Sequence, residues 1–334
     1  MKSIAPAISV IIYAYNRDKY LLDAIKSVVN QTLARDLYEI IVIKNFMESV
    51  IDSYIDKNNV ISFYDESEAV GQMILNAVDK SSGNILSFLE DDDIFEENKL
   101  KVVYDHFTAF QNDGFYRNDF FAINDEGQPF LEGRQKHQKD PIYVLKKKGY
   151  VEYLPKIFRS ELHSYPSCMS IRREILLSNA DSLRKVRSSQ DHFLFYCGVI
   201  SSKRMYFDNL SLTGYRVHTS ASRFKGSFQD YTEKLKMQSL RDIETFKMIN
   251  SAPSHSDASF AKQLSLLEAR IHLRLAKGED SSKITIIQIL SLFWWGIQVR
   301  SKYFLTLPFL TILVIFAPNF GSSLYYKIRS KAFT

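Results

Sequence analysis

The sequence predicts an α/β fold, with a mostly parallel central sheet flanked by helices and a helical appendage at the C-terminus. Four short apolar runs rich in β-branched residues alternate with segments of helical periodicity, at residues 8–13, 39–43, 60–64 and 85–89. Because each run is apolar on both faces, we expect the strands of a parallel sheet that is covered by helices.

The helices of the first half follow from the spacing of apolar residues between these runs. Apolar positions recur at helical intervals over residues 19–31, and a short helix is expected at 51–56. A third helix opens at Gly71 and continues to residue 78. The strands and helices therefore alternate, which is the pattern of βαβ units.

The second half continues with less regular elements. We expect helices at 98–110, 172–179 and 193–200, and strands at 166–171 and 204–212. Two amphipathic helices follow, over 229–249 and 260–275.

The domain organisation follows from length and from changes in composition. A chain of 334 residues is long enough for one domain of catalytic size and an appendage. We expect the domain over 1–225, with a polar, weakly periodic stretch at 133–162 that is typical of a functional lid or a disordered insert. Amphipathic helices are expected over 226–280, and apolar, aromatic helices over 281–334.

Charge and cysteine content exclude some classes of protein. The net charge of +5 is mild and the basic residues are scattered, so we expect no nucleic-acid partner. Cys168 and Cys197 lie in apolar surroundings and form neither a disulfide framework nor a zinc pattern. We expect buried thiols in a reducing compartment, and no secretory signal, because residues 1–6 lead straight into the first strand.

Four consecutive carboxylates, at residues 90–93, follow directly on the last apolar run. Four negative charges at the end of an inner strand are costly unless a positive charge lies there. Oxygen ligands suit Mg²⁺ or Mn²⁺, and the alternative is a solvated acidic turn. Tyr15, Asn45 and Asp65 also follow strands, at the edge where parallel sheets bind ligands. This convergence favours a cation site.

The C-terminal region consists of two apolar runs, at 284–299 and 303–316. Each run is shorter than the roughly 20 residues that a membrane-spanning helix needs. Basic residues lie on both sides of the second run, at Arg300, Lys302 and Lys327, so a single crossing would leave one basic flank on the wrong side. We expect helices in the membrane interface or a shallow re-entrant hairpin. The alternative is a buried pair of helices in a dimer or domain contact.

Six segments in order resemble the motifs of glycosyltransferase family 2, whose enzymes have the GT-A (Rossmann-like) fold. The likeness covers roughly residues 8–223. Residues 8–17 (ISVIIYAYNR) resemble the first strand and the nucleotide-holding turn, 39–43 the second strand, and 87–95 the metal-binding Asp-X-Asp segment. Residues 167–175 resemble the strand that precedes an arginine-rich helix start, Gln190-Asp191 the acidic pair with the catalytic base, and YRVH at 215–218 the later tyrosine-arginine-X-histidine motif.

The resemblance implies roles for individual residues. Asp191 would be the catalytic base, although an Asp beside a helix start is also a common N-cap. The metal ligands would be Asp92 with Glu90 and Asp93, and also His218, for which a structural role is the alternative. Asp91 would contact the sugar, the ribose or a metal-bound water. The other donor-binding residues would be Ala14, Tyr15, Asn16, Arg17, Asn45, Asp65, Gly71, Asn76 and Arg216.

The chain departs from the family pattern at four places. Tyr13 replaces the usual proline, and Lys44-Asn45-Phe46 replaces the aspartate pair that normally reads the base. An asparagine amide can still donate to and accept from a base edge. The first acid of the metal motif is Glu90, and the spacing from Gly71 to Asn76 is one residue shorter than expected.

The resemblance implies an inverting, metal-dependent glycosyltransferase that uses Mg²⁺ or Mn²⁺. Residues 1–110 would bind a UDP- or GDP-sugar and 111–225 the acceptor, a glycan or polyprenyl lipid. With the C-terminal helices, it predicts a protein on the cytoplasmic face of the cell membrane, as a monomer or an oligomer. One alternative is a non-catalytic GT-A scaffold that binds a sugar nucleotide. A nucleotidyltransferase would need a glycine-rich phosphate loop, and residues 13–18 contain no glycine.

Overall fold

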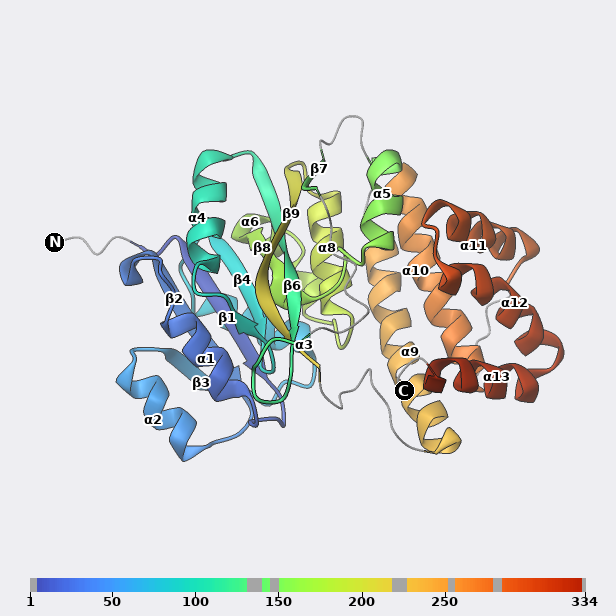
Figure 1. Cartoon of the computed structure of the whole chain (residues 1–334), viewed down its shortest axis with the longest axis horizontal. Helices are drawn as coiled ribbons and strands as arrows, with labels where there is room; N and C mark the ends of the chain where they lie inside the picture. Colours follow the sequence, from blue (N-terminus) through green and yellow to red (C-terminus); the bar gives the residue numbers. More distant parts are fainter. Residues whose placement is uncertain are drawn as a thin grey trace. The chain divides into compact units, whose positions relative to one another are not determined.

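The structure is a computed structural model that describes residues 5–130, 140–144, 150–217, 227–251, 256–278 and 284–331 (Figure 1). The chain divides into two compact units. The first consists of Met1–Gly149 and Leu162–Val217, and the second of Tyr150–Glu161 and His218–Thr334.

Among the described residues, a nine-stranded sheet forms the centre of the first unit. Its order is β3-β2-β1-β4-β8-β6-β9-β5, and β7 also pairs with β9. The first four strands along the chain are parallel to one another: β1 Ile8–Ala14, β2 Tyr38–Lys44, β3 Ile61–Tyr64 and β4 Ile85–Glu90. The others are β5 Ile94–Phe95, β6 Asp113–Ile123, β7 Ile142–Val144, β8 Met169–Arg172 and β9 Arg204–Arg216.

Helices cover both faces of this sheet (Figure 1). The even-numbered residues of β1, from Ile8 to Ala14, pack in one apolar cluster with buried side chains of α1 Leu21–Val29, α2 Ser49–Lys57 and α4 Lys99–Ala109. Helix α3 Val70–Asp79 also contacts β1 and β2. Alternate residues of a strand point to opposite faces, so a strand covered on both sides is apolar throughout. The predicted α/β fold with a central sheet flanked by helices is confirmed.

The sheet is parallel in its first part and mixed in the rest. Strand β8 runs antiparallel to β4 and to β6, whereas β6 and β9 are parallel. Strand β6 was not predicted, because its buried residues include Asp113, Arg117, Asn118 and Asp119 and therefore give no apolar run. The remaining helices of this unit are α6 Arg173–Leu177, α7 Ala180–Leu183 and α8 Gln190–Ile200, with 3-10 turns at Arg35–Leu37 and Pro166–Cys168.

The second unit is helical where the structure describes it. Helix α9 Phe228–Ser251 packs against α10 Ser256–Leu275, and α12 Lys302–Phe316 contacts α10, α11 Ile286–Gln298 and α13 Pro318–Lys331. Helix α13 lies within the range 281–334 in which helices are expected, but neither of the two predicted apolar runs includes it. Pro318 stands at its start, where proline is favoured because the first helical N–H needs no partner. No described helix is both long enough and apolar enough to cross a membrane.

The predicted lid at 133–162 lies partly outside the described residues. Its described portion contains β7, and it also contains α5 Tyr150–Arg159, which belongs to the second unit and contacts α10.

Candidate active site

The carboxyl ends of the four parallel strands lie level with one another. In the register of the sheet, Ala14 pairs with Lys44, Lys44 with Tyr64, and Tyr13 with Glu90. The segments that follow these strands therefore leave the sheet at one edge. This edge carries several of the residues that the sequence singles out, namely Tyr15, Asn16, Arg17, Asn45, Asp65 and the acidic run from Glu90.

The loops after β1 and β2 are joined by a pair of asparagines. The backbone N–H of Asn16 donates to Oδ1 of Asn45 over 2.7 Å, and Nδ2 of Asn45 donates to Oδ1 of Asn16 over 2.8 Å. Asn16 adopts a left-handed backbone with φ 53°, which asparagine tolerates better than most residues. Each amide keeps unused hydrogen-bonding capacity on an exposed surface. Ala14 is buried at the end of β1, whereas Tyr15 is exposed.

Asp65, which follows β3, is held by α3. Its side chain accepts a hydrogen bond from Asn76 and another, of 2.7 Å, from the backbone N–H of Ser67. Burial works against ionisation of Asp65, but these hydrogen bonds lower its pKa below the usual value. The structure therefore brings Asp65 and Asn76 together, with the neutral amide of Asn76 donating to the carboxylate of Asp65.

Gly71 makes a close backbone contact within the first unit. Its N–H donates to the carbonyl of Val186 over 2.9 Å, and a Cβ at this position would lie 1.8 Å from the carbonyl oxygen of Leu183. The close packing of α3 against residues 183–186 therefore explains why position 71 is a glycine, and no contact with a ligand is needed to explain it.

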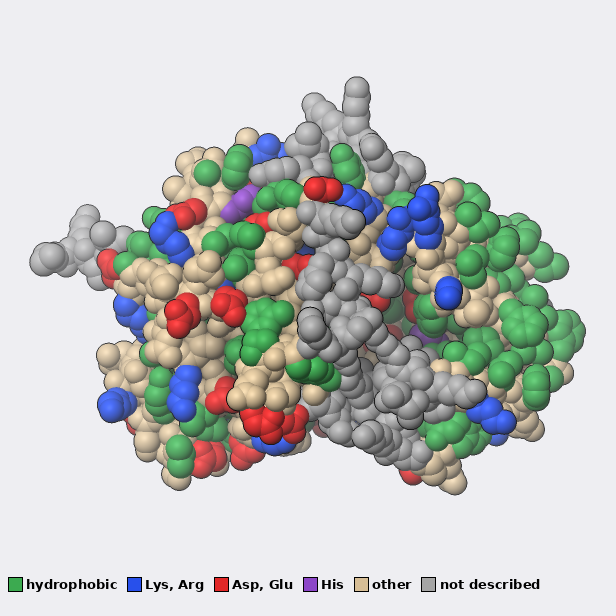
Figure 2. All heavy atoms as spheres, in the orientation of Figure 1, with side chains coloured by type: hydrophobic (Ala, Val, Ile, Leu, Met, Phe, Trp, Pro, Cys, Tyr) green, Lys and Arg blue, Asp and Glu red, His purple; other side chains and the backbone are tan. Residues whose placement is uncertain are grey.

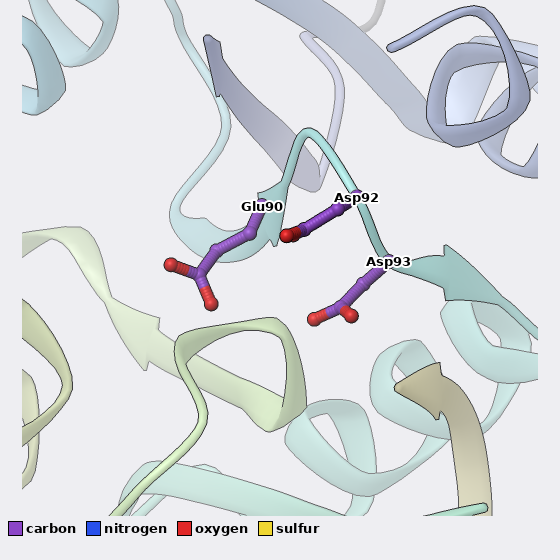
Figure 3. Close-up of side chains that lie close together, drawn as sticks. All are labelled: Glu90, Asp92 and Asp93. Carbon is purple, nitrogen blue, oxygen red and sulfur yellow. The ribbon is translucent and has the colours of Figure 1, made fainter. Parts of the chain in front are cut away.

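The acidic run forms the turn between β4 and β5 and brings three carboxylates together. One oxygen from each of Glu90, Asp92 and Asp93 lies within 4.8 Å of the others, and Figure 3 shows the side chains extending from the turn into a common space. Asp93 is buried, and its Oδ2 has no hydrogen-bond partner among the described residues.

The electrostatics of these carboxylates favour a bound cation. Burial and the neighbouring carboxylates raise the pKa of Glu90 well above its usual value and that of Asp93 to about 7. Full ionisation of the three groups is therefore unfavourable without a positive charge. An all-oxygen donor set with one buried, unpartnered oxygen fits Mg²⁺ or Mn²⁺.

Arg17 braces the same turn from the loop after β1. Its guanidinium contacts both carboxylate oxygens of Asp91, with Nε donating to Oδ2 over 2.7 Å, and its NH1 lies 3.0 Å from Oδ2 of Asp92. Burial still raises the pKa of Asp91, in spite of this ion pair. Asp91 is paired with Arg17 and is not among the three carboxylates whose oxygens lie within 4.8 Å of one another.

Ser167 and Lys99 stabilise the turn by hydrogen bonds, and neither was predicted from the sequence as a site residue. The hydroxyl of Ser167 accepts from the backbone N–H of Glu90 over 3.0 Å, and it lowers the pKa of Asp93 against the effect of burial. The ammonium of Lys99, fully buried, donates to the carbonyl of Ser167 and to Oγ1 of Thr213. Burial lowers the pKa of Lys99 to about 7. One feature of the sequence could have indicated Lys99: it occupies a position on the buried, mostly apolar face of α4.

Arg216 fixes the turn from the end of β9. Its backbone N–H donates to Oδ1 of Asp93 over 3.0 Å, and its Nε donates to the carbonyl of Asp92 over 2.7 Å. Its NH1 donates to the carbonyls of Asn124 and Asp125, and the side chain is fully buried. These contacts make Arg216 a positioning residue for the turn, and donor contact by its side chain stays a prediction. His218 lies outside the described residues.

Asp191 lies in the first turn of α8, near the acidic group. The N-cap of α8 is Ser189, so the alternative role of Asp191 as N-cap does not apply. Oδ2 of Asp191 accepts from the backbone N–H of Tyr165 over 3.3 Å, and Nε2 of the adjacent Gln190 donates to Oε1 of Glu90 over 3.1 Å. The charge of Asp191 contributes to the raised pKa of Glu90. The structure thus brings Asp191 close to the carboxylates of the turn.

Comparison with known proteins identifies the family. The sequence model of glycosyl transferase family 2 matches residues 9–178, which include β1 to β4 and the acidic turn. An uncharacterized glycosyltransferase of Rickettsia bellii is 33% identical over 130 residues, which are 37% of this chain and 18% of that protein. Another, of Rickettsia typhi, is 33% identical over 101 residues, which are 29% of this chain and 30% of that protein. The chain thus spans less than a third of either relative.

A solved structure supports the fold over nearly the whole chain. The crystal structure of S. aureus TarS 1-349 in complex with UDP-GlcNAc is similar with a TM-score of 0.56 and 14% sequence identity. The similarity covers 98% of this chain and 91% of that one, and shows the GT-A fold. Together with the match of the family model to half of the sequence, this confirms the resemblance seen in the motifs: the chain belongs to glycosyl transferase family 2.

Proposed function

We propose that the chain is an inverting, metal-dependent glycosyltransferase that moves a sugar from a UDP- or GDP-sugar to an acceptor. The observation that carries the proposal is the group of oxygens from Glu90, Asp92 and Asp93, within 4.8 Å of one another at the carboxyl edge of the sheet. The complex of TarS with UDP-GlcNAc supports a nucleotide-sugar donor, since that protein shares the fold.

The residues at this edge fit the parts of such a donor. Asn45 has a half-buried amide that could bond the edge of a base, and Asp65 is an ionised acceptor that could bond ribose hydroxyls. Glu90, Asp92 and Asp93 would hold Mg²⁺ or Mn²⁺. When bound, the ion would neutralise charge on the diphosphate as it departs.

Asp191 would act as the general base. As the acceptor oxygen forms its bond to the anomeric carbon, the bond from that carbon to the diphosphate breaks, and its electron pair leaves with the diphosphate. The proton of the acceptor hydroxyl passes to a carboxylate oxygen of Asp191. Attack from the face opposite the leaving group inverts the anomeric centre. We propose a glycan hydroxyl or a polyprenyl lipid as acceptor, in the synthesis of cell-surface or lipid-linked glycans.

The test measures donor binding and turnover in the same protein. A panel of UDP- and GDP-sugars is first screened by thermal shift with Mn²⁺, because a ligand at 100 times its Kd stabilises a protein by about 2.7 kcal/mol. Release of nucleoside diphosphate is then followed for the best donor. We expect release to stop when EDTA is added and in Asp92→Asn, but to continue in Asp105→Asn, which alters an exposed carboxylate of α4.

Each part of the proposal has an outcome that contradicts it. Release that continues in EDTA and in Asp92→Asn would exclude the metal-dependent mechanism. A donor that binds without release, with or without acceptors, would favour the non-catalytic scaffold. Proton NMR of the product reports the anomeric configuration, and retention would exclude inversion.

A further inference from the structure

Helices α11 and α12 expose large apolar side chains along one side of each helix. The exposed residues recur at intervals of three and four, which places them in a stripe. We call this surface the α11–α12 apolar face. It consists of Ile286, Ile287, Leu290, Phe293, Trp294 and Ile297 of α11, and Leu305, Phe309, Ile312, Ile315 and Phe316 of α12. Figure 2 shows hydrophobic side chains gathered over these helices.

The opposite sides of both helices are packed within the second unit. Trp295 is buried and meets the ring of Phe158 edge-on, with 5.4 Å between centroids. Gly296 lies against the backbone of α12, where a Cβ would come within 2.9 Å of the carbonyl carbon of Phe304. The helices are thus firmly docked, and their exposed sides form a defined surface. Contiguous apolar surfaces of this kind mark sites of interaction with a protein or a membrane.

The charges around the face distinguish between these two partners. Residues 284–334 contain no aspartate or glutamate, although the chain has 38 acidic residues. The same stretch contains five basic residues, of which Arg300 and Lys302 are exposed between the two helices. In a symmetric pair of copies both partners would bring the same cations to the interface, and this stretch supplies no acidic residue to pair with them. An anionic lipid surface would instead attract each of them.

We propose that the α11–α12 apolar face inserts into the headgroup region of a bilayer that contains anionic phospholipid. The helices have 13 and 15 residues, so each is about 20 Å long and shorter than the roughly 30 Å hydrocarbon core. Each also has one side packed on the protein, which leaves only the other side for lipid. Helices of this kind lie in the plane of the interface, where tryptophans such as the exposed Trp294 are favoured. The proposal does not depend on glycosyl transfer.

The test is cosedimentation of the full chain with vesicles of phosphatidylcholine and phosphatidylglycerol. We expect the wild type to pellet with these vesicles, and its tryptophan emission to shift to shorter wavelength as Trp294 leaves water. The double variant Ile287→Glu, Leu290→Glu should bind at least ~100-fold more weakly, because two apolar contacts are lost and two charges face anionic headgroups. The double variant Arg300→Gln, Lys302→Gln should bind ~30-fold more weakly.

A matched control lies in the first unit. Met47 and Val50 are 76% and 62% exposed, as are Ile287 and Leu290, so Met47→Glu, Val50→Glu introduces the same charges at equal exposure. This control should bind vesicles like the wild type, and circular dichroism with thermal unfolding verifies that each variant is folded.

Several results would overturn the proposal. They are failure of the folded wild type to pellet, equal binding by the Ile287→Glu, Leu290→Glu variant, and equal binding to vesicles of phosphatidylcholine alone. Sedimentation velocity without vesicles provides a further check. A wild-type dimer that the same variant dissociates would show that a second copy covers the face.

Discussion

At the scale of single residues, Asp93 shows why a bound cation would stabilise the acidic turn. One of its oxygens accepts the backbone N–H of Arg216, and the other is buried without a partner among the described residues. Its pKa is raised to about 7, first by burial and then by Asp92. A proton or a metal ion can relieve this repulsion, so the two compete for the same oxygens.

Asp191 is the residue on which the proposed proton transfer depends. We expect Asp191→Asn to bind the donor as tightly as the wild type, because the amide oxygen can still accept the N–H of Tyr165. Release of nucleoside diphosphate should fall ~10²–10⁴-fold, which is the usual contribution of a general base. Calorimetry gives the donor affinity, and a coupled assay gives the rate.

The control is Asp181→Asn, which changes an exposed carboxylate in the short helix α7. It should leave both quantities unchanged. A near-normal rate in Asp191→Asn would rule out this residue as the base.

Backbone strain around the site could not be predicted from the sequence. Asn16, Tyr165 and Ser189 all have positive φ values, of 53°, 71° and 52°. Two of them direct a backbone N–H at a site residue, from Asn16 to Asn45 and from Tyr165 to Asp191. Such conformations cost about 1–3 kcal/mol each and persist only where the surrounding fold imposes them. No local sequence pattern encodes that constraint.

At the scale of elements, Arg216 links the end of β9 to the acidic turn. We expect Arg216→Lys to lower the free energy of unfolding by about 1.5–3 kcal/mol, because a single ammonium cannot replace the bonds from the guanidinium to three backbone carbonyls. Urea denaturation measures the change.

The matched control is Arg187→Lys, at a half-exposed arginine whose nearest carboxylate, on Glu68, lies 3.7 Å away. Its stability should be within about 0.5 kcal/mol of the wild type. Unchanged stability of Arg216→Lys with weaker donor binding would contradict the positioning role and favour the donor contact that the sequence predicts.

The sequence predicts those elements whose buried positions produce a regular pattern of apolar residues. Strands β1, β2 and β4 were predicted within one residue at each end, because burial on both faces makes them apolar throughout. Strand β3 was also predicted within one residue, although it lies at the edge of the sheet and its residues are exposed or half-buried. Strand β6 was not predicted because it buries charged and polar residues such as Arg117 and Asp119, which lie 3.6 Å apart within the strand and interrupt its apolar pattern. The apolar run 303–316 coincides with α12 within one residue, but nothing in that run predicts that a further helix, α13, begins at Pro318.

At the scale of the whole molecule, family motifs predicted which segments meet but not how their side chains pair. The resemblance located Arg17 and Asp91 in separate motifs, and only the fold reveals that they bond each other across 74 positions of sequence. Lys99 belongs to no family motif, and Ser167 begins the segment 167–175 without an assigned role in the site, yet both support the turn. Such contacts depend on tertiary packing, which a single sequence does not report.

The two proposals concern different units and can fail separately. The acidic turn belongs to the first unit, and the α11–α12 apolar face to the second. Loss of vesicle binding would leave the chemistry of the turn intact, and loss of metal binding would leave the apolar face intact.

The most direct test of the account is a crystal of the full chain grown with Mn²⁺ and a nucleoside diphosphate. An anomalous difference map at the manganese edge identifies the ion independently of its surroundings. We predict a peak within coordination distance of Asp92 and of Glu90 or Asp93, next to the phosphates. Bound nucleotide with no peak at these carboxylates, or manganese held elsewhere, would contradict the account.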